Sequence, residues 1–183
     1  MIAEHYLQDV LLQLRKYRDM AEKAIAQISE EQLFGALDPE SNSIALIMKH
    51  MAGNMRSRWT DFLTTDGEKP DRQRDREFLI EEVDTAAHVR AQWEDGWART
   101  LSAIESLRPD ELSRVVTIRG EPHTVLEAIN RQLMHYAAHV GQIVLLAKHY
   151  AGEQWQSLSI PKGRSGEFDV SKQGTAYPDE GTR

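Results

Sequence analysis

Apolar residues recur every three or four positions from Ile2 to Ile28, and neither glycine nor proline interrupts the run. Because an α-helix turns once in about 3.6 residues, this spacing places them on one helical face. The face consists of Tyr6, Val10, Leu14, Tyr17, Ala21, Ala24 and Ile28. A long helix with one apolar face must bury that face against other elements, so the sequence predicts a fold built on packed helices.

The sequence predicts two further helices after this one. The second runs from about Ile44 to Thr64, and Asn42 or Ser43 can accept its first free amides as the N-cap. The third covers Glu77 to Leu107 and ends at Arg108-Pro109, because the residue before proline avoids helical geometry. The long connection between them permits a non-sequential packing order.

A short hairpin and a fourth helix complete the predicted elements. Val115 to Ile118 is β-branched, a turn follows, and His123 to Val125 forms the returning strand. Thr124 and Glu127 have the spacing of a capping box, which starts a helix that continues to about Tyr150. The expected architecture is therefore an all-α four-helix bundle with a small β-hairpin before the fourth helix.

The predicted bundle occupies residues 1–152, and residues 153–183 form a C-terminal tail. The tail lacks helical periodicity and is rich in glycine and proline, but Trp155 and the stretch Leu158 to Ile160 are apolar. We expect the tail to pack on the bundle or on a partner subunit.

The composition excludes several classes of protein. Cysteine is absent, so the chain forms no disulfide and offers neither a thiolate ligand nor a cysteine nucleophile. A formal net charge of −7 repels nucleic-acid backbones. No apolar run approaches the roughly 18 residues that cross a bilayer, and the polar N-terminus lacks the pattern of a signal peptide. We expect a cytoplasmic protein that binds neither nucleic acid nor a membrane.

One basic stretch, Lys69 to Arg76, alternates with Asp71 and Asp75. Such mixed charge is typical of a solvated linker rather than of an anion-binding site. We expect it to lie in solvent between the second and third helices.

Three histidines carry the strongest chemical signal: His50 in the second predicted helix, and His135 and His139 in the fourth. Three imidazoles can hold zinc, nickel or iron and leave a coordination position open for water or substrate. Tyr136 stands where the H-E-x-x-H motif of zinc proteases has its glutamate, so that site is excluded. From the residues alone, histidines satisfied by the core or by solvent are the commoner explanation of this spacing, and a metal site is the alternative.

On helical wheels all three histidines lie beside the apolar stripe, so we expect them at the rim of a groove. Asn54, Gln132 and Gln142 lie at nearby angles and could orient the imidazoles or a bound ligand. Each is also compatible with an ordinary polar boundary of the core.

The remaining histidines are predicted to have no ligand role: His5, His88, His123 and His149. His149 lies about 15 Å further along the fourth helix than His139, too far to share its ion. Three methionines at helical spacing are expected in the core: Met48, Met51 and Met55.

Several stretches resemble a known group of proteins. They are Lys49 to Asn54, Arg58 to Leu63, Thr117 to Glu121, His135 to Ile143 and Ser159 to Gly163. In these stretches, over about Ile2 to Tyr150, the chain resembles uncharacterised bacterial members of the DinB/YfiT-like superfamily of metal-binding four-helix bundles.

The resemblance implies an up-down-down-up bundle, a homodimer, and a divalent ion held by His50, His135 and His139. Zinc and nickel are the first candidates for the ion, with iron and manganese as further ones. Some members of the superfamily are thiol-dependent transferases or isomerases, some resemble hydrolases, and many have no known activity. The resemblance therefore names neither one reaction nor a catalytic residue.

Two functional hypotheses follow. In the first, the ion holds a water or a low-molecular-weight thiol that attacks a small electrophilic substrate, in a hydrolase or a thiol S-transferase. In the second, the protein is a non-catalytic dimeric bundle in which a metal is structural or absent. Met134 and Leu145 lie opposite the histidines and make the fourth helix apolar on a second side, as a dimer contact requires.

Overall fold

The structure is a computed structural model that describes residues 2–167, and this part of the chain is mostly helical. Its α-helices are α1 (Ile2–Ile25), α2 (Glu30–Phe34), α3 (Ile44–Trp59), α4 (Ala86–Glu105) and α5 (Val125–Ala151). The two strands are β1 (Val115–Ile118) and β2 (Glu121–Thr124). Short 3-10 helices are η1 (Arg74–Phe78), η2 (Pro109–Ser113), η3 (Gly152–Gln154) and η4 (Ser165–Glu167).

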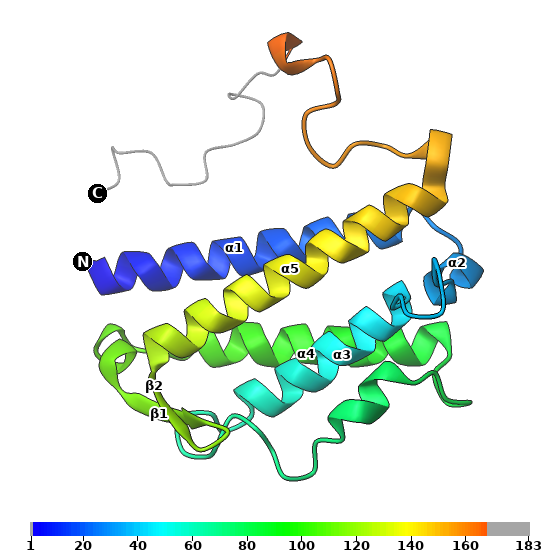
Figure 1. Ribbon diagram of the computed structural model, residues 1–183. Helices are drawn as coiled ribbons and strands as arrows, with labels where there is room; N and C mark the ends of the chain where they lie inside the picture. The colour runs from blue at the N-terminus through cyan, green and yellow to red at the C-terminus, as the bar shows by residue number, and fades with distance from the viewer. Residues whose placement is uncertain (1, 168–183) are drawn as a thin grey trace.

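The four long helices pack in two pairs, α1 with α5 and α3 with α4 (Figure 1). In that view α3 and α4 run in one direction, and α1 and α5 run in the other. The hairpin lies at the end of the molecule where α5 begins. Contacts between α3 and α5 and between α1 and α4 join the two pairs, so all four helices share one core.

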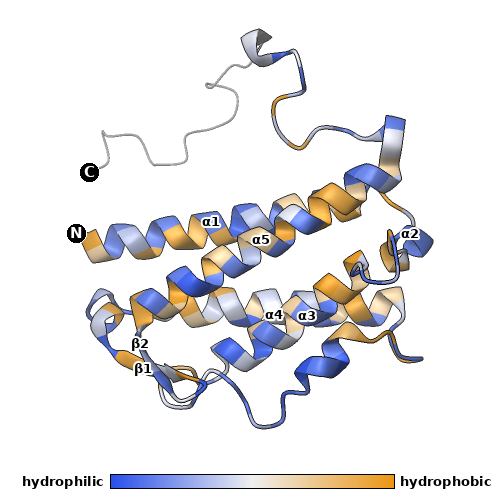
Figure 2. Ribbon diagram, viewed as in Figure 1, coloured by the Kyte–Doolittle hydropathy of each residue, from blue (hydrophilic) through white to orange (hydrophobic). Residues whose placement is uncertain are grey.

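Apolar faces of the long helices supply that core, and polar residues gather on their outer faces (Figure 2). The predicted core methionines Met48, Met51 and Met55 are buried. Within residues 2–167, no helix combines the length and the apolar character that a membrane span requires.

Helix starts follow the capping signals of the sequence. Thr124 caps α5, and its side chain and that of Glu127 form the reciprocal bonds of the predicted capping box. Ser43, rather than Asn42, caps α3. A further capping box, between Ser29 and Gln32, starts the short helix α2, which was not among the predicted elements.

The predicted hairpin is present as an antiparallel pair of strands. Its second strand begins at Glu121, earlier than predicted, and Val125 belongs to α5. Arg119 and Gly120 both have positive φ angles, 57° and 75°, as a two-residue hairpin turn requires. The carboxylate of Asp66 accepts the backbone N–H of both turn residues at 2.8 and 2.7 Å, which fixes the hairpin tip to the connection after α3.

The connection between α3 and α4 is longer than predicted. The second predicted helix ends at Trp59 rather than Thr64, because Asp61 takes a φ of 46° that a helix cannot accommodate. The prediction that the third helix begins at Glu77 is also wrong, since Thr85 is the N-cap of α4 and Glu77 lies in η1.

The stretch Lys69 to Arg76 is not a fully solvated linker. Only 2% of the Arg72 side chain is exposed, and it forms ion pairs with Glu68 and Glu77. Burying a guanidinium is unfavourable unless carboxylates satisfy it, so these pairs hold parts of the connection together. Glu77 also contacts His50 of α3.

In the C-terminal segment, Trp155 and Leu158 pack against the core, and Gln156 exchanges hydrogen bonds with Gln27. Residues 168–183 of the predicted tail lie outside the described residues. The division into a bundle and a tail stays a prediction.

Candidate metal centre

The structure brings three histidines from two helices together. His50 comes from α3, and His135 and His139 come from successive turns of α5. One ring nitrogen of each lies within 4.8 Å of those of the other two. Nitrogens that share one zinc ion lie within about 4.2 Å of each other, because each bond is about 2.0–2.1 Å. The group is therefore close to a metal-bound arrangement and could hold an ion.

Hydrogen bonds orient two of these rings. Nδ1 of His50 lies 2.9 Å from Oε2 of Glu77, and Nδ1 of His139 lies 2.8 Å from Oε1 of Gln142. Both oxygens accept, so each Nδ1 carries a proton, and in a neutral ring Nε2 is then the nitrogen that has the lone pair.

His135 also has a free ring nitrogen. Its Nε2 is buried and has no hydrogen-bond partner within the described part of the chain. A buried polar atom without a partner is costly, and metal coordination would satisfy it. The three residues present thus fit a divalent ion.

The environment keeps the half-buried imidazoles neutral. Burial, together with the smaller effect of the charges that His139 and His50 could carry, lowers the pKa of His135 to about 3. Burial also lowers the pKa of His139, against the opposing effect of its bond with Gln142. A neutral imidazole is the form that binds a metal ion.

The group contains only the three histidines. No aspartate, glutamate or further histidine of residues 2–167 lies close enough to all of them to complete it. A site with three protein ligands is typical of catalytic zinc, whereas structural zinc is bound by four.

The predicted supporting residues behave differently from one another. Gln142 contacts His139 directly, whereas Gln132 and Asn54 bond to each other at 2.6 Å. Both also contact the hydroxyl of Tyr136. No hydrogen bond from Gln132 or Asn54 to an imidazole occurs in the described structure, and both side chains are buried.

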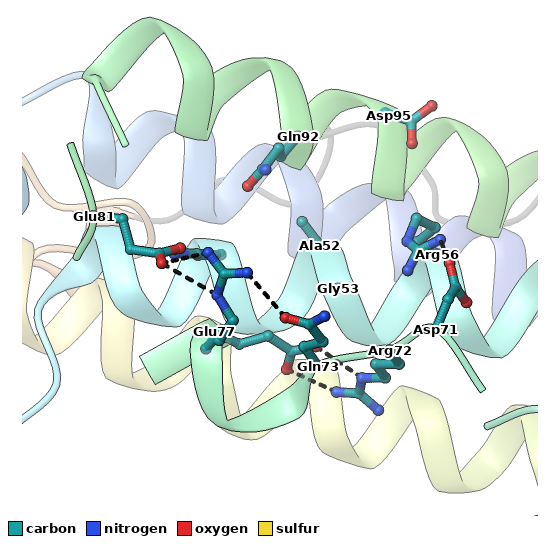
Figure 3. Close-up of a pocket in the computed structure, with 12 residues that line it drawn as sticks. Ala52, Gly53, Arg56, Asp71, Arg72, Gln73, Glu77, Glu81, Gln92 and Asp95 are labelled. Carbon is teal, nitrogen blue, oxygen red and sulfur yellow. Dashed lines mark hydrogen bonds and ion pairs between the residues drawn. The ribbon is translucent and has the colours of Figure 1, made fainter. Parts of the chain in front are cut away.

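Two residues beside the histidines were not predicted from the sequence: Glu77, which contacts His50, and Arg72, which holds Glu77 by two hydrogen bonds of 2.8 Å (Figure 3). Burial acts to raise the pKa of Glu77, but hydrogen bonds from Arg72 and His50 outweigh it and hold the pKa below its ordinary value. Arg72 belongs to the charged run Lys69 to Arg76, which was interpreted as a solvated linker, and Glu77 was predicted as the start of the third helix.

A cavity of about 390 Å³ lies between α3, α4 and the connection after α3, and Glu77 and Arg72 form part of its wall (Figure 3). The cations of its lining are already paired: Lys49 with Asp84, Arg56 with Asp71, Arg72 with Glu77, and Arg76 with Glu81. The lining is therefore close to electrically neutral.

The other histidines of the described residues lie outside this group: His5, His88, His123 and His149. His149 is exposed near the end of α5. His88 contacts Gln92, and His123 contacts the carbonyl of Glu121.

Residues 1–164 match a family described as "Protein of unknown function (DUF1572)". None of the curated proteins compared with the chain matches it.

Proposed function

Because the chain belongs to the DUF1572 family, for which no function is described, we propose its function from its own site: it binds a divalent transition metal through His50, His135 and His139. The observation that carries this proposal is the convergence of three imidazole nitrogens from α3 and α5 within 4.8 Å. The buried Nε2 of His135, which lacks a partner among the described residues, supports it.

The proposed activity is attack on a small electrophile, in a hydrolase or a thiol S-transferase. Three imidazoles suit zinc or nickel best, with iron and manganese as alternatives. When bound, such an ion would lower the pKa of a water or low-molecular-weight thiol at its open position. The chain has no cysteine, so the thiol would arrive as a cosubstrate. Burial would keep His135 and His139 neutral, and Glu77 and Gln142 would orient His50 and His139.

We place the chain in the DinB/YfiT-like superfamily as an up-down-down-up four-helix bundle. The opposite directions of the pairs α3/α4 and α1/α5 support this topology, as does the long connection between two helices that run in parallel. The positions of the three histidines, on α3 and α5, agree with the same assignment.

A non-catalytic homodimer is the second candidate. Met134 and Leu145 on α5 are 67% and 66% exposed. Their positions place them on one side of the helix together with Ala138 and Gly141, which are also exposed. A second copy of the chain could cover this face, in which case a metal would only stabilise the fold.

Elemental analysis and an activity screen test the proposal. The purified protein should carry about one equivalent of divalent metal per chain, and His135→Ala should lose it. His149→Ala removes an exposed histidine of the same helix and should retain the metal. Undiminished metal in His135→Ala would remove this residue as a ligand. Across a panel of electrophiles supplied with water or small thiols, equal turnover by wild type and His50→Ala would favour the non-catalytic candidate.

A further inference from the structure

We propose that Glu77, held by Arg72, is a positioning residue of the metal centre, which fixes the tautomer and the ring orientation of His50. This inference rests on the proposed metal binding at the three histidines. It assigns a role to the connection between α3 and α4, although all three proposed ligands come from α3 and α5.

The geometry fixes the proton of His50. Oε2 of Glu77 lies 2.9 Å from Nδ1, and the same oxygen accepts a hydrogen bond from Nη2 of Arg72 at 2.8 Å. Nε of Arg72 donates to the other carboxylate oxygen at 2.8 Å. A carboxylate held by a guanidinium fork is an acceptor, so Nδ1 of His50 donates, and in the neutral imidazole Nε2 is then the nitrogen with the lone pair. Carboxylates in this position strengthen the binding of metal by histidine.

The arginine is itself fixed. Its Nη1 lies 3.3 and 3.2 Å from the two carboxylate oxygens of Glu68, and its side chain is 2% exposed. Glu68, Arg72, Glu77 and His50 thus form one chain of polar contacts. An imidazole held in this way loses little rotational freedom when it binds an ion.

The surroundings of Glu77 and His50 favour the same arrangement. A Cβ atom on residue 53 would lie 2.3 Å from Oε1 of Glu77. The carboxylate can therefore lie against α3 only because Gly53 has no side chain. The Phe78 ring packs on the His50 ring with centroids 4.7 Å apart. Consecutive residues of η1 therefore restrain the imidazole by a hydrogen bond and by a ring contact.

The alternative is that the ion pair of Glu77 with Arg72 only stabilises the fold. The chain contains another buried ion pair that serves for comparison. Asp84 bonds to Lys49 at 2.6 Å, and its side chain is 1% exposed. This pair also joins the connection to α3, and Lys49 adjoins His50 in the sequence. Among residues 2–167, however, Asp84 has no hydrogen bond to an imidazole. Asp84→Asn is therefore the matched control for Glu77→Gln.

The test measures zinc affinity by competition with a chromophoric chelator, alongside urea unfolding. Glu77→Gln should bind zinc 10- to 100-fold more weakly, roughly the loss seen when partners of metal ligands are removed. Asp84→Asn should retain wild-type affinity even where it unfolds more easily. Nitrogen NMR of His50 in the zinc-free protein should show Nδ1 protonated in the wild type and a mixture of tautomers in Glu77→Gln.

A second pair of variants keeps the carboxylate. Gly53→Ala should displace Glu77, whose flexible side chain can yield, and weaken zinc binding in a folded protein. Gly141→Ala, on α5, meets no atom within 4 Å and should leave zinc affinity unchanged. Equal zinc affinity in wild type, Glu77→Gln and Gly53→Ala would overturn the positioning role while metal binding stands. A wild-type protein that binds no zinc, nickel, iron or manganese would overturn the proposed function as well.

Discussion

The indole Nε1 of Trp59 donates a hydrogen bond of 3.0 Å to the hydroxyl of Tyr136, which joins α3 to α5 inside the core. The hydroxyl also accepts from Gln132 and donates to Asn54. Burial raises the pKa of Tyr136 to about 12, so its hydroxyl keeps its proton near neutral pH. This network lies beside His135 and links the helices that carry the three histidines.

Tyr136→Phe should lower the free energy of unfolding by about 1–3 kcal/mol, because it leaves buried partners unsatisfied. Urea unfolding measures the change. Tyr150→Phe is the matched control, since the hydroxyl of Tyr150 is buried without a hydrogen-bond partner in the described structure. Its removal should be neutral or stabilising. Equal losses in both variants would contradict the role given to the network.

Gly96→Ala should destabilise the packing of α4 on α3. A Cβ atom at residue 96 would lie 3.1 Å from the Cα of Ala52, and backbone cannot yield as a flexible side chain can. The expected loss is about 1–3 kcal/mol, as for other overpacked cores. Thermal or urea unfolding tests this prediction, and a stability equal to or above that of wild type would refute it.

Acid should release the hairpin tip from Asp66. Burial acts to raise the pKa of this carboxyl, but the N–H groups of Glu68, Gly120 and Arg119 outweigh it and hold the pKa at about 2. Since the unfolded chain binds this proton more readily, the stabilisation is complete above the ordinary pKa of 3.8 and disappears as pH falls through about 2. The stability difference between wild type and Asp66→Asn, measured by urea unfolding, should shrink over this window. A difference independent of pH would exclude Asp66 as the cause.

Removing the metal should lower the thermal midpoint of the loaded protein. A ligand that binds only the folded state adds about 2.7 kcal/mol to the unfolding free energy when its free concentration is 100 times its Kd. Calorimetry with and without a chelator measures this effect. His135→Ala should not respond to the chelator, and an unchanged midpoint in the loaded wild type would contradict the linkage.

Local signals in the sequence predicted much of this fold. The capping box of Thr124 and Glu127 placed the start of α5, and Ser43 was one of two candidates for the cap of α3. These signals depend on residues a few positions apart, so the sequence displays them directly. The helical spacing of His135 and His139 likewise placed both on neighbouring turns of one helix.

The contacts of the connection after α3 could not be predicted in this way. Glu77 meets His50 from 27 positions away, through a segment whose path depends on its packing against α3. Its approach depends on Gly53, and nothing in the local sequence distinguishes that glycine from one in open space such as Gly141. Tertiary packing, rather than periodicity, decides these contacts.

His50 and His135 stand 85 positions apart in a chain without cysteine. An ion shared by both would act as a reversible cross-link between distant segments, as a disulfide does in secreted domains. Unlike a disulfide, the ion would leave when the chain unfolds, so the stability that it adds would rise with the concentration of free metal. Cellular metal supply would then control how long each molecule survives, in addition to any chemistry at the site.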